Sequence, residues 1–338
     1  MKAIVQTQYG PPDVLQIAGI DKPTPTGNQV LVKVHAASIN AGDYRVRRGK
    51  PFLLRFMMGG MLRPKDPRVG SDVAGRVEAV GENVKQFRPG DEVFGCAHGA
   101  FAEYVLARDA YLALKPAIVS FETAAAVPVA ALTALQGLRN AGGIQAGQKV
   151  VVQGASGGVG TFAVQLAKLF GAEVTAVCSP KNLNRARSIG ADHVIDYTKE
   201  DFTRGRPRYD LILAVNGYHS LSAYWRALSP QGVYVCAGGA MPQIFQAMLL
   251  GSLISRNRDR KACFMGIAKV NQEDLIFLAE LLTAGKIAPI IDRSCALGEI
   301  VEAFRYVEEK HAQGKVVITM DEITRVPATD ERLGRAPT

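Results

Sequence analysis

The sequence lacks long apolar runs, closely spaced cysteines and any abundance of aromatic residues. Among its 338 residues there is one tryptophan, and aromatic side chains make up 7% of the chain. A membrane-spanning helix needs roughly 18 consecutive apolar residues. The longest apolar stretches, 53–61 and 244–253, are too short or are interrupted by glycine. We therefore expect no membrane span.

The chain also lacks the cysteine spacing of a disulfide framework or of a cysteine-based zinc site. It opens directly on Lys2, Ala3, Ile4 and Val5, which is typical of a strand and not of a signal peptide. Both features favour a cytoplasmic protein. The five cysteines, all far apart, are Cys96, Cys178, Cys236, Cys263 and Cys295.

Acidic residues are fewer than basic ones, 31 against 40, which gives a formal net charge of +9. The basic residues are scattered, except for short clusters at 45–48 and 256–261, and no nucleic-acid-binding motif accompanies them. We expect no nucleic-acid partner. The surplus charge is explained either by an ordinary solvated surface or by binding of a small polyanionic cofactor.

Sequence texture divides the chain into three parts. Residues 1–118 contain short apolar or alternating runs separated by turn clusters, which indicates an all-β region. Residues 119–268 alternate short apolar strands with helical stretches, which indicates a doubly wound parallel α/β sheet. Residues 269–338 return to mixed elements and end in a polar tail. The predicted strands are 1–7, 29–38, 73–80, 92–95, 102–106, 150–153, 173–178, 193–196, 210–215, 233–237, 262–265, 287–291 and 315–320, and the predicted helices include 121–138, broken at Pro128, 273–284 and 297–310.

Two irregular segments carry no clear period. The apolar segment 52–61 is either part of the core or a mobile loop over an apolar pocket, and both readings stay open. The segment near 241–257 is expected to be a loop. Together with residues 45–65, we expect it to shape the substrate pocket.

A glycine-rich turn follows the β-branched run 150–153 and precedes an amphipathic helix that stops at Gly171. Glycines in such a turn let the main chain approach a pyrophosphate, and the free N–H groups of the helix terminus favour an anion. The spacing is a variant of the dinucleotide fingerprint, which a tight structural turn also explains. The residues assigned to cofactor binding here are Gly154, Ser156, Gly157, Gly158, Val159 and Gly160.

The second strand of this region indicates which dinucleotide binds. An NAD site usually places an acid at this strand end to accept from the ribose 2′-hydroxyl. Here the strand ends without an acid, and Ser179, Lys181 and Asn182 can donate hydrogen bonds to a 2′-phosphate, with Arg185 one turn further on. NADP(H) is therefore favoured over NAD(H), although Lys181 and Arg185 also fit a solvated face.

Three further residues follow later strand ends, which meet at the ligand-binding edge of such a sheet. Tyr197 follows the third strand and either stacks on adenine or covers the core edge. Asn216 and Gly238 end the fourth and fifth strands. We expect all three to contact the cofactor.

In combination, these segments resemble the medium-chain dehydrogenase/reductase superfamily, in its zinc-free quinone oxidoreductase branch. The resemblance implies a Rossmann domain inserted into a GroES-like β-barrel catalytic domain made from both chain ends, and a homodimer or homotetramer. It also places Thr133 and Lys315, and with them Lys310, beside the cofactor. The matching segments, in family order, are Gly70–Gly81, Arg88–Val93, Gly99–Tyr104, Pro128–Leu135, Gly154–Gly160, Gly190–Tyr197 and Gly314–Val317.

The resemblance also bears on the metal. Zinc-dependent members have a cysteine where this chain has Asn40 and a histidine where it has Ser71, so we expect no metal. Zinc-free relatives carry an Asn-x-x-Asp segment, which residues 40–43 match. The resemblance implies that Asn40 bonds the substrate oxygen and that Asp43 orients the segment. Asn40, Asp43 and Tyr44 are the catalytic candidates, although Tyr44 lies one place before the tyrosine of some relatives. Turn formation beside Gly42 explains Asp43 and Tyr44 equally well.

The predicted function is an NADPH-dependent, zinc-independent reductase that transfers hydride to a quinone or an α,β-unsaturated carbonyl. Two alternatives remain: an alcohol dehydrogenase or carbonyl reductase of the same superfamily, and a catalytically weak NADPH-binding sensor or scaffold. The sequence does not identify the physiological acceptor or a proton donor.

Overall fold

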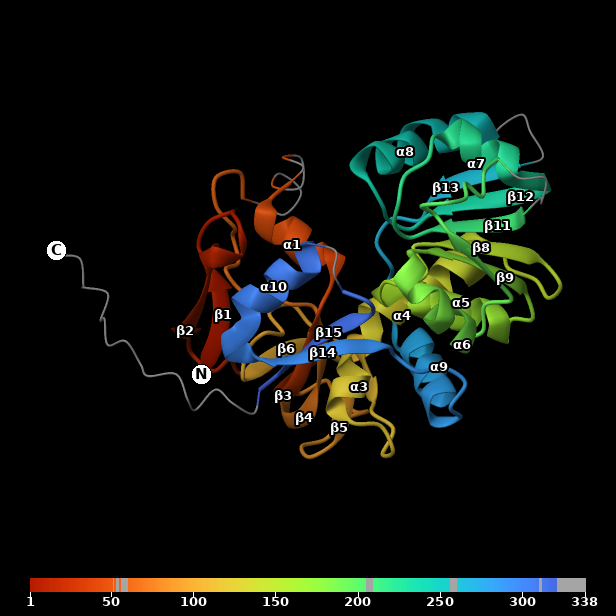
Figure 1. The fold of residues 1–338 in the computed structure, drawn as a ribbon. Helices are drawn as coiled ribbons and strands as arrows, with labels where there is room; N and C mark the ends of the chain where they lie inside the picture. Colours follow the sequence, from red (N-terminus) through yellow and green to blue (C-terminus); the bar gives the residue numbers. More distant parts are fainter. Residues whose placement is uncertain are drawn as a thin grey trace.

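The structure is a computed structural model that describes residues 1–50, 52, 55, 60–204, 209–255, 260–309 and 312–320. Most of the predicted segment 52–61, Lys310 and the tail from residue 321 lie outside these residues. Two large sheets occupy separate lobes of Figure 1; α4 (Pro128–Gln136) lies between them, and α3 (Phe121–Ala125) lies against the strands of one lobe. None of the helices in the described part of the chain has the length and apolar character of a bilayer-crossing segment.

The first lobe contains a six-stranded sheet in which every neighbouring pair is parallel. Its spatial order is β10-β9-β8-β11-β12-β13, so the chain reverses its direction of progression between β8 and β11. In a sheet of this order, ligands bind outside the carboxyl ends of the strands at the reversal point. The strands are β8 (Lys149–Gln153), β9 (Glu173–Cys178), β10 (His193–Asp196), β11 (Tyr209–Ala214), β12 (Leu228–Cys236) and β13 (Lys261–Phe264).

The apolar run of β8 is explained by helices on both faces of this sheet. Successive side chains of a strand point to opposite faces. Val150 and Val152 therefore pack in one core cluster with residues of α4 and α5, whereas Val151 packs in another with residues of α7 and α8. The helices that follow the strands are α5 (Gly158–Leu169), α6 (Leu183–Ser188), α7 (Leu221–Ala227) and α8 (Met241–Ser255).

The second lobe contains a mostly antiparallel sheet with the order β14-β15-β3-β4-β5-β7, and β6 also pairs with β3. The long strand β3 pairs with β15 over its last residues and with β6 over its first residues, so segments from both ends of the chain share one sheet. The strands are β3 (Gln29–Ile39), β4 (Asp72–Val80), β5 (Glu92–Cys96), β6 (Tyr104–Arg108), β7 (Leu112–Leu114), β14 (Ile291–Ala296) and β15 (Lys315–Thr319).

Smaller elements complete the described residues. A two-stranded antiparallel sheet is formed by β1 (Lys2–Gln6) and β2 (Leu15–Gly19). Helix α1 (Ala41–Arg48) follows β3 directly, and α9 (Gln272–Thr283) and α10 (Ile300–Glu308) precede the last strands.

Most predicted strands and helices are present within one or two residues of the predicted bounds, but three predictions were wrong. The segment near 241–257 is not a loop, because its described part forms α8, with Ile244 and Ala247 buried against the sheet. The strand near 287–291 instead occupies Ile291–Ala296, an edge strand whose polar residues conceal it. β12 begins at Leu228 and not at 233. The domain boundaries at 118/119 and 268/269 stay a prediction.

Candidate active site

The glycine-rich turn connects β8 to α5 at the reversal point of the parallel sheet. Gly154 has φ +84°, and a Cβ there would lie 2.8 Å from the backbone nitrogen of Asn216. A Cβ at Gly160 would lie 2.1 Å from the carbonyl oxygen of Gly154. These two glycines are therefore required for the strand, the helix and the neighbouring strand end to pack closely.

Gly157 has a different environment. A Cβ there would meet only the Gly154 carbonyl oxygen, at 3.8 Å, so packing does not require glycine at this position. The first N–H groups of a helix have no partner within the helix. Here the first i→i−4 bond runs from Thr161 N to Gly157 O, so the N–H groups of Gly158, Val159 and Gly160 are the orphan donors. These donors fit the pyrophosphate of a dinucleotide.

The end of β9 presents the residues predicted to select the dinucleotide. Asn182 is 3% exposed and donates from Nδ2 to Ser179 Oγ at 2.9 Å. Ser179 Oγ therefore accepts from inside the protein, which leaves its own hydroxyl hydrogen for a ligand. Lys181 is exposed, whereas Arg185 donates to the carbonyl oxygen of Gln313 at 2.7 Å. Lys181 is thus freer than Arg185 to reach a 2′-phosphate.

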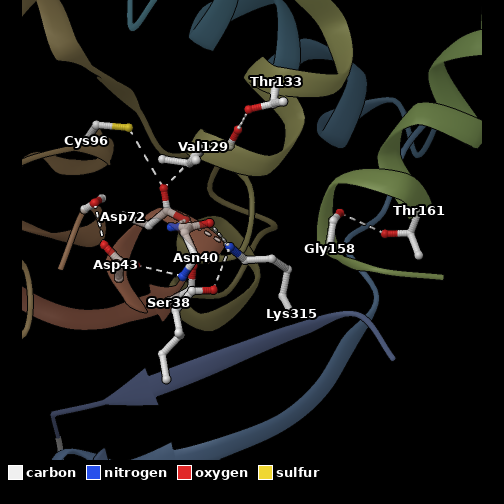
Figure 2. Close-up of polar contacts among 12 residues, drawn as sticks. Ser38, Asn40, Asp43, Asp72, Cys96, Val129, Thr133, Gly158, Thr161 and Lys315 are labelled. Carbon is white, nitrogen blue, oxygen red and sulfur yellow. Dashed lines mark hydrogen bonds and ion pairs between the residues drawn. The ribbon is translucent and has the colours of Figure 1, made fainter. Parts of the chain in front are cut away.

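Three other predicted cofactor residues follow the ends of β11, β12 and β10, at the same edge of the sheet. Asn216 lies beside Gly154, and a Cβ on Gly238 would lie 2.5 Å from the carbonyl oxygen of Val215. Tyr197, directly after β10, is 62% exposed. Ser156 lies within the glycine turn. Thr133 on α4 donates from Oγ1 to the carbonyl oxygen of Val129 at 2.7 Å (Figure 2).

A buried polar cluster lies in the second lobe, where β3, β4 and β15 meet (Figure 2). At its centre is Asp72, the first residue of β4, with no solvent exposure. Its Oδ2 accepts from Ser38 Oγ at 2.7 Å, Asn40 Nδ2 at 2.8 Å and Lys315 Nζ at 3.1 Å. Its Oδ1 accepts from Val129 N at 2.8 Å. The carboxylate is thus fully hydrogen-bonded and paired with a buried ammonium, as a charge in this position must be.

Lys315 joins this cluster to the glycine turn. Its side chain is 3% exposed, and its stem passes so close to Gly158 that a Cβ there would lie 2.8 Å from Lys315 Cδ. Its Nζ donates to Asn40 Oδ1 at 2.6 Å and to the carbonyl oxygen of Ile39 at 3.4 Å. The stem of Lys315 thus lies against the glycine turn, whereas its charge lies at Asn40, and its predicted position beside the cofactor stays a prediction.

Asn40 and Asp43 occupy the start of α1. Asp43 Oδ2 accepts from Asn40 N at 2.7 Å, as in a capping box, and its Oδ1 accepts from Ser71 Oγ at 2.8 Å. Burial raises the pKa of Asp43 to about 6, although the hydrogen bond from Ser71 opposes the shift. The role implied for Asp43, which is to orient the segment, fits these contacts.

Tyr44 does not join the cluster. It packs against the apolar core of the second lobe, and no hydrogen bond between it and the cluster is found among the described residues. Arg45 on the same helix donates to the carbonyl oxygen of Gly239, just after β12, at 3.0 Å. This contact links α1 to the parallel sheet.

Sequence reasoning missed Asp72. The available signal was an acid directly before the predicted strand 73–80, within the segment Gly70–Gly81. Its importance became visible only when the fold placed Asn40, Val129 and Lys315 around it.

The residues of this cluster do not fit a zinc ion. Asn40 Oδ1 already accepts from an ammonium, which would repel a cation, and Ser71 is committed to Asp43. Cys96 lies beside Asp72, but burial raises the pKa of its thiol well above the ordinary value, which disfavours the thiolate that zinc requires. Within the described residues there is no group of three or more His, Cys, Asp and Glu side chains placed to hold a metal.

Comparison with known proteins places the chain in a family. Residues 26–117 match the family model "Alcohol dehydrogenase GroES-like domain", and residues 189–318 match the model "Zinc-binding dehydrogenase". The name of the second model refers to a metal that the cluster described above does not accommodate.

Three similar proteins span nearly the whole chain. The 2-methylene-furan-3-one reductase of Solanum lycopersicum is 36% identical over 94% of this chain and 79% of its own length. The NADPH-dependent alkenal/one oxidoreductase of Arabidopsis thaliana is 33% identical over the same shares, 94% and 79%. The quinone oxidoreductase of Coxiella burnetii has a similar solved structure, with a TM-score of 0.83 and 31% identity over 95% of this chain and 99% of that one. The chain belongs to the medium-chain dehydrogenase/reductase superfamily, in its quinone oxidoreductase-like branch of NAD(P)-dependent oxidoreductases, with a GroES-like domain and a Rossmann-type parallel sheet.

Proposed function

We propose that this protein is an NADPH-dependent, zinc-independent reductase of α,β-unsaturated carbonyls or quinones. The observation that carries the proposal is the connection between two sites. The stem of Lys315 lies against Gly158 in the glycine turn, and its ammonium ends at Asn40. A dinucleotide held by the turn is therefore close to the polar cluster of the second lobe. The names of the similar reductases of enones, alkenals and quinones support the same chemistry.

One group of residues binds the cofactor, and Asn40 polarises the carbonyl group of the acceptor. The N–H groups at the start of α5 hold the pyrophosphate, and Ser179 and Lys181 bind the 2′-phosphate. When bound, the nicotinamide supplies a hydride, that is, two electrons and one hydrogen nucleus. Asn40 donates an amide hydrogen bond to the carbonyl oxygen of the acceptor, where negative charge develops as the hydride adds. A proton from water then completes the saturated carbonyl or the hydroquinone.

In the described part of the polar cluster, the carboxyl and the ammonium beside Asn40 already have hydrogen-bond partners, so we assign the proton to water. Asp43 accepts two hydrogen bonds, and the ammonium of Lys315 is engaged with three acceptors. Most of the rate enhancement therefore comes from holding the acceptor beside the nicotinamide, with a smaller part from the Asn40 hydrogen bond.

The test is turnover with two cofactors and two acceptors. We expect NADPH oxidation, followed by its absorbance, with an enone and with 9,10-phenanthrenequinone, and much slower oxidation of NADH. Fluorescence titration should give tighter binding of NADPH than of NADH. Binding without turnover across a broad acceptor panel would instead indicate a sensor or scaffold, and tighter NADH binding would contradict the proposed cofactor.

Two further proposals concern metal and assembly. Elemental analysis of the active protein should give no stoichiometric zinc, and activity should survive a strong chelator. We also propose that the chain acts in the cytoplasm. We propose further that it forms a homodimer or a homotetramer, and the mass measured by light scattering after gel filtration will distinguish these two states.

A further inference from the structure

We propose that Lys315 is a positioning residue that fixes the orientation of the Asn40 carboxamide, so that one amide N–H is always presented to the acceptor oxygen. This inference rests on the proposed reductase function and adds to it a residue that acts through Asn40 and not on the cofactor phosphates.

The backbone leaves Lys315 little freedom. β15 pairs antiparallel with β3, and Val316 lies opposite Ile39, so Lys315 enters the strand beside Asn40. Its backbone N–H donates to the carbonyl oxygen of Ile290 at 2.7 Å. Gly314 before it has φ +142°, and a Cβ there would lie 2.2 Å from the same carbonyl oxygen. The chain therefore enters β15 along a path that only glycine permits, which directs the side chain of Lys315 inward.

The stem of Lys315 is held as firmly as its backbone. It lies against Gly158, where any side chain would collide with Cδ. Gly158 thus serves two purposes. Its N–H is one of the donors at the start of α5, and the absence of a side chain leaves room for the stem of Lys315. The ammonium is then fixed at the far end of an extended, buried side chain.

The two charged neighbours of Asn40 discriminate between its amide orientations. The ammonium of Lys315 donates to Oδ1 at 2.6 Å, and Nδ2 donates to the carboxylate of Asp72 at 2.8 Å. Rotating the carboxamide by half a turn would place N–H groups against the ammonium and the amide oxygen against the carboxylate. Two charge-assisted hydrogen bonds would be replaced by two repulsive contacts. The ion pair therefore determines which way the amide points.

One N–H of Asn40 remains after these bonds are made. An Asn amide nitrogen has two hydrogens, and only the bond to Asp72 is found for Nδ2 within the described residues. Asn40 as a whole is 8% exposed, and a buried N–H requires an acceptor from water or a ligand. This second N–H is the donor that we assign to the acceptor oxygen.

The test compares a variant that removes both charges with a variant that removes Asn40. Lys315→Met combined with Asp72→Asn keeps a stem of similar shape against Gly158 and leaves no unpaired buried charge. With an enone as substrate, we expect kcat to fall at least tenfold while the dissociation constant of NADPH changes less than twofold. Adding Asn40→Ala to this double variant should then cost little more, because the effects of residues that act through one another are not additive. Lys315→Arg should retain more of kcat than Lys315→Met.

A second readout does not depend on turnover. In protein labelled with 15N-asparagine, the side-chain amide of Asn40, assigned by its loss in Asn40→Ala, should give two distinct and sharp proton signals. In the double variant these signals should move and broaden as the amide samples both orientations. Unchanged signals would overturn the inference, as would a loss that falls on NADPH affinity or adds fully to that of Asn40→Ala. If the wild-type protein reduces no acceptor, the proposed function fails, and the amide signals alone still decide whether Lys315 orients Asn40.

Discussion

The glycine turn and the polar cluster are built in opposite ways. The turn comes from consecutive residues, 154–160, whose spacing is readable in the sequence. The cluster is assembled from Asn40, Asp72 and Lys315, which lie far apart in the sequence and converge only when β15 pairs with β3. The turn can therefore be changed one residue at a time, whereas each member of the cluster depends on the charge of another.

The largest expected difference between the glycine turn and the polar cluster is the loss of unfolding free energy on breaking the buried ion pair of Lys315 and Asp72. Lys315→Met leaves Asp72 buried and unpaired, and losing one partner of such a pair costs about 3–5 kcal/mol of unfolding free energy. Lys315→Met combined with Asp72→Asn should recover most of this loss, because no charge is stranded. Urea unfolding of the cofactor-free protein measures both. Equal destabilisation of the single and double variants would show that the two charges are not coupled.

A matched pair of glycine variants distinguishes the residue of the turn that serves packing from the residue that serves cofactor binding. Gly160→Ala brings a Cβ against backbone atoms of Gly154 and Ala155 and should cost about 1–3 kcal/mol or more. Gly157→Ala meets open space and should change stability by no more than about 0.5 kcal/mol. Instead it should weaken NADPH binding, because the added methyl group occupies the space in front of the helix N-terminus. Unfolding curves and NADPH titration of both variants measure this difference. Strong NADPH binding by Gly157→Ala would contradict the placement of the pyrophosphate.

The same contrast explains what the sequence could predict. Strands β9 and β10 were placed at their observed bounds because short apolar runs between turn residues are local signals. α8 was missed because its apolar residues are too continuous to show a helical period, and β14 was missed because its edge position tolerates Asp292, Arg293 and Ser294. In both elements the tertiary environment, which no local window contains, decided the structure.

The site divides in the same way. Gly154, Gly157 and Gly160 were located by spacing, and the structure shows that two of them serve packing and one leaves open space. Asp72 was missed, and Lys315 was assigned only to the cofactor. Their contact depends on the pairing of β15 with β3, two strands that the whole parallel-sheet segment separates in the sequence. Long-range pairing of this kind leaves no pattern in the sequence around either residue.

Titration of Asp43 offers a smaller effect within the cluster. Burial raises its pKa from 3.8 to about 6, so between these values the folded state binds a proton that the unfolded state releases. Stability contributed by this group is therefore fully present below pH 4 and is lost as the pH rises to about 6. The slope approaches 1.36 kcal/mol per pH unit. Asp43→Asn removes it, so the difference in unfolding free energy between the two proteins should vary across pH 4–6 and stay constant above pH 7. A constant difference at every pH would show that Asp43 is not perturbed.

The smallest expected effect tests the exposed edge of the cofactor site. Lys181→Glu should weaken NADPH binding about tenfold, or about 1.4 kcal/mol, and should leave NADH binding nearly unchanged, because only NADPH carries the 2′-phosphate. The effect should shrink at high salt, since Lys181 is exposed and its charge is screened. Arg187→Glu, the same charge reversal on the following helix α6, is the matched control and should weaken the binding of both cofactors only slightly. If Lys181→Glu and Arg187→Glu weaken NADPH equally, the general charge of this surface, and not a 2′-phosphate contact, sets the preference. If only Lys181→Glu weakens NADPH binding more than NADH binding, Lys181 contacts the 2′-phosphate directly. Its effect is then local, like that of each residue of the glycine turn. The residues of the buried cluster differ, because each of them depends on its charged or polar neighbours.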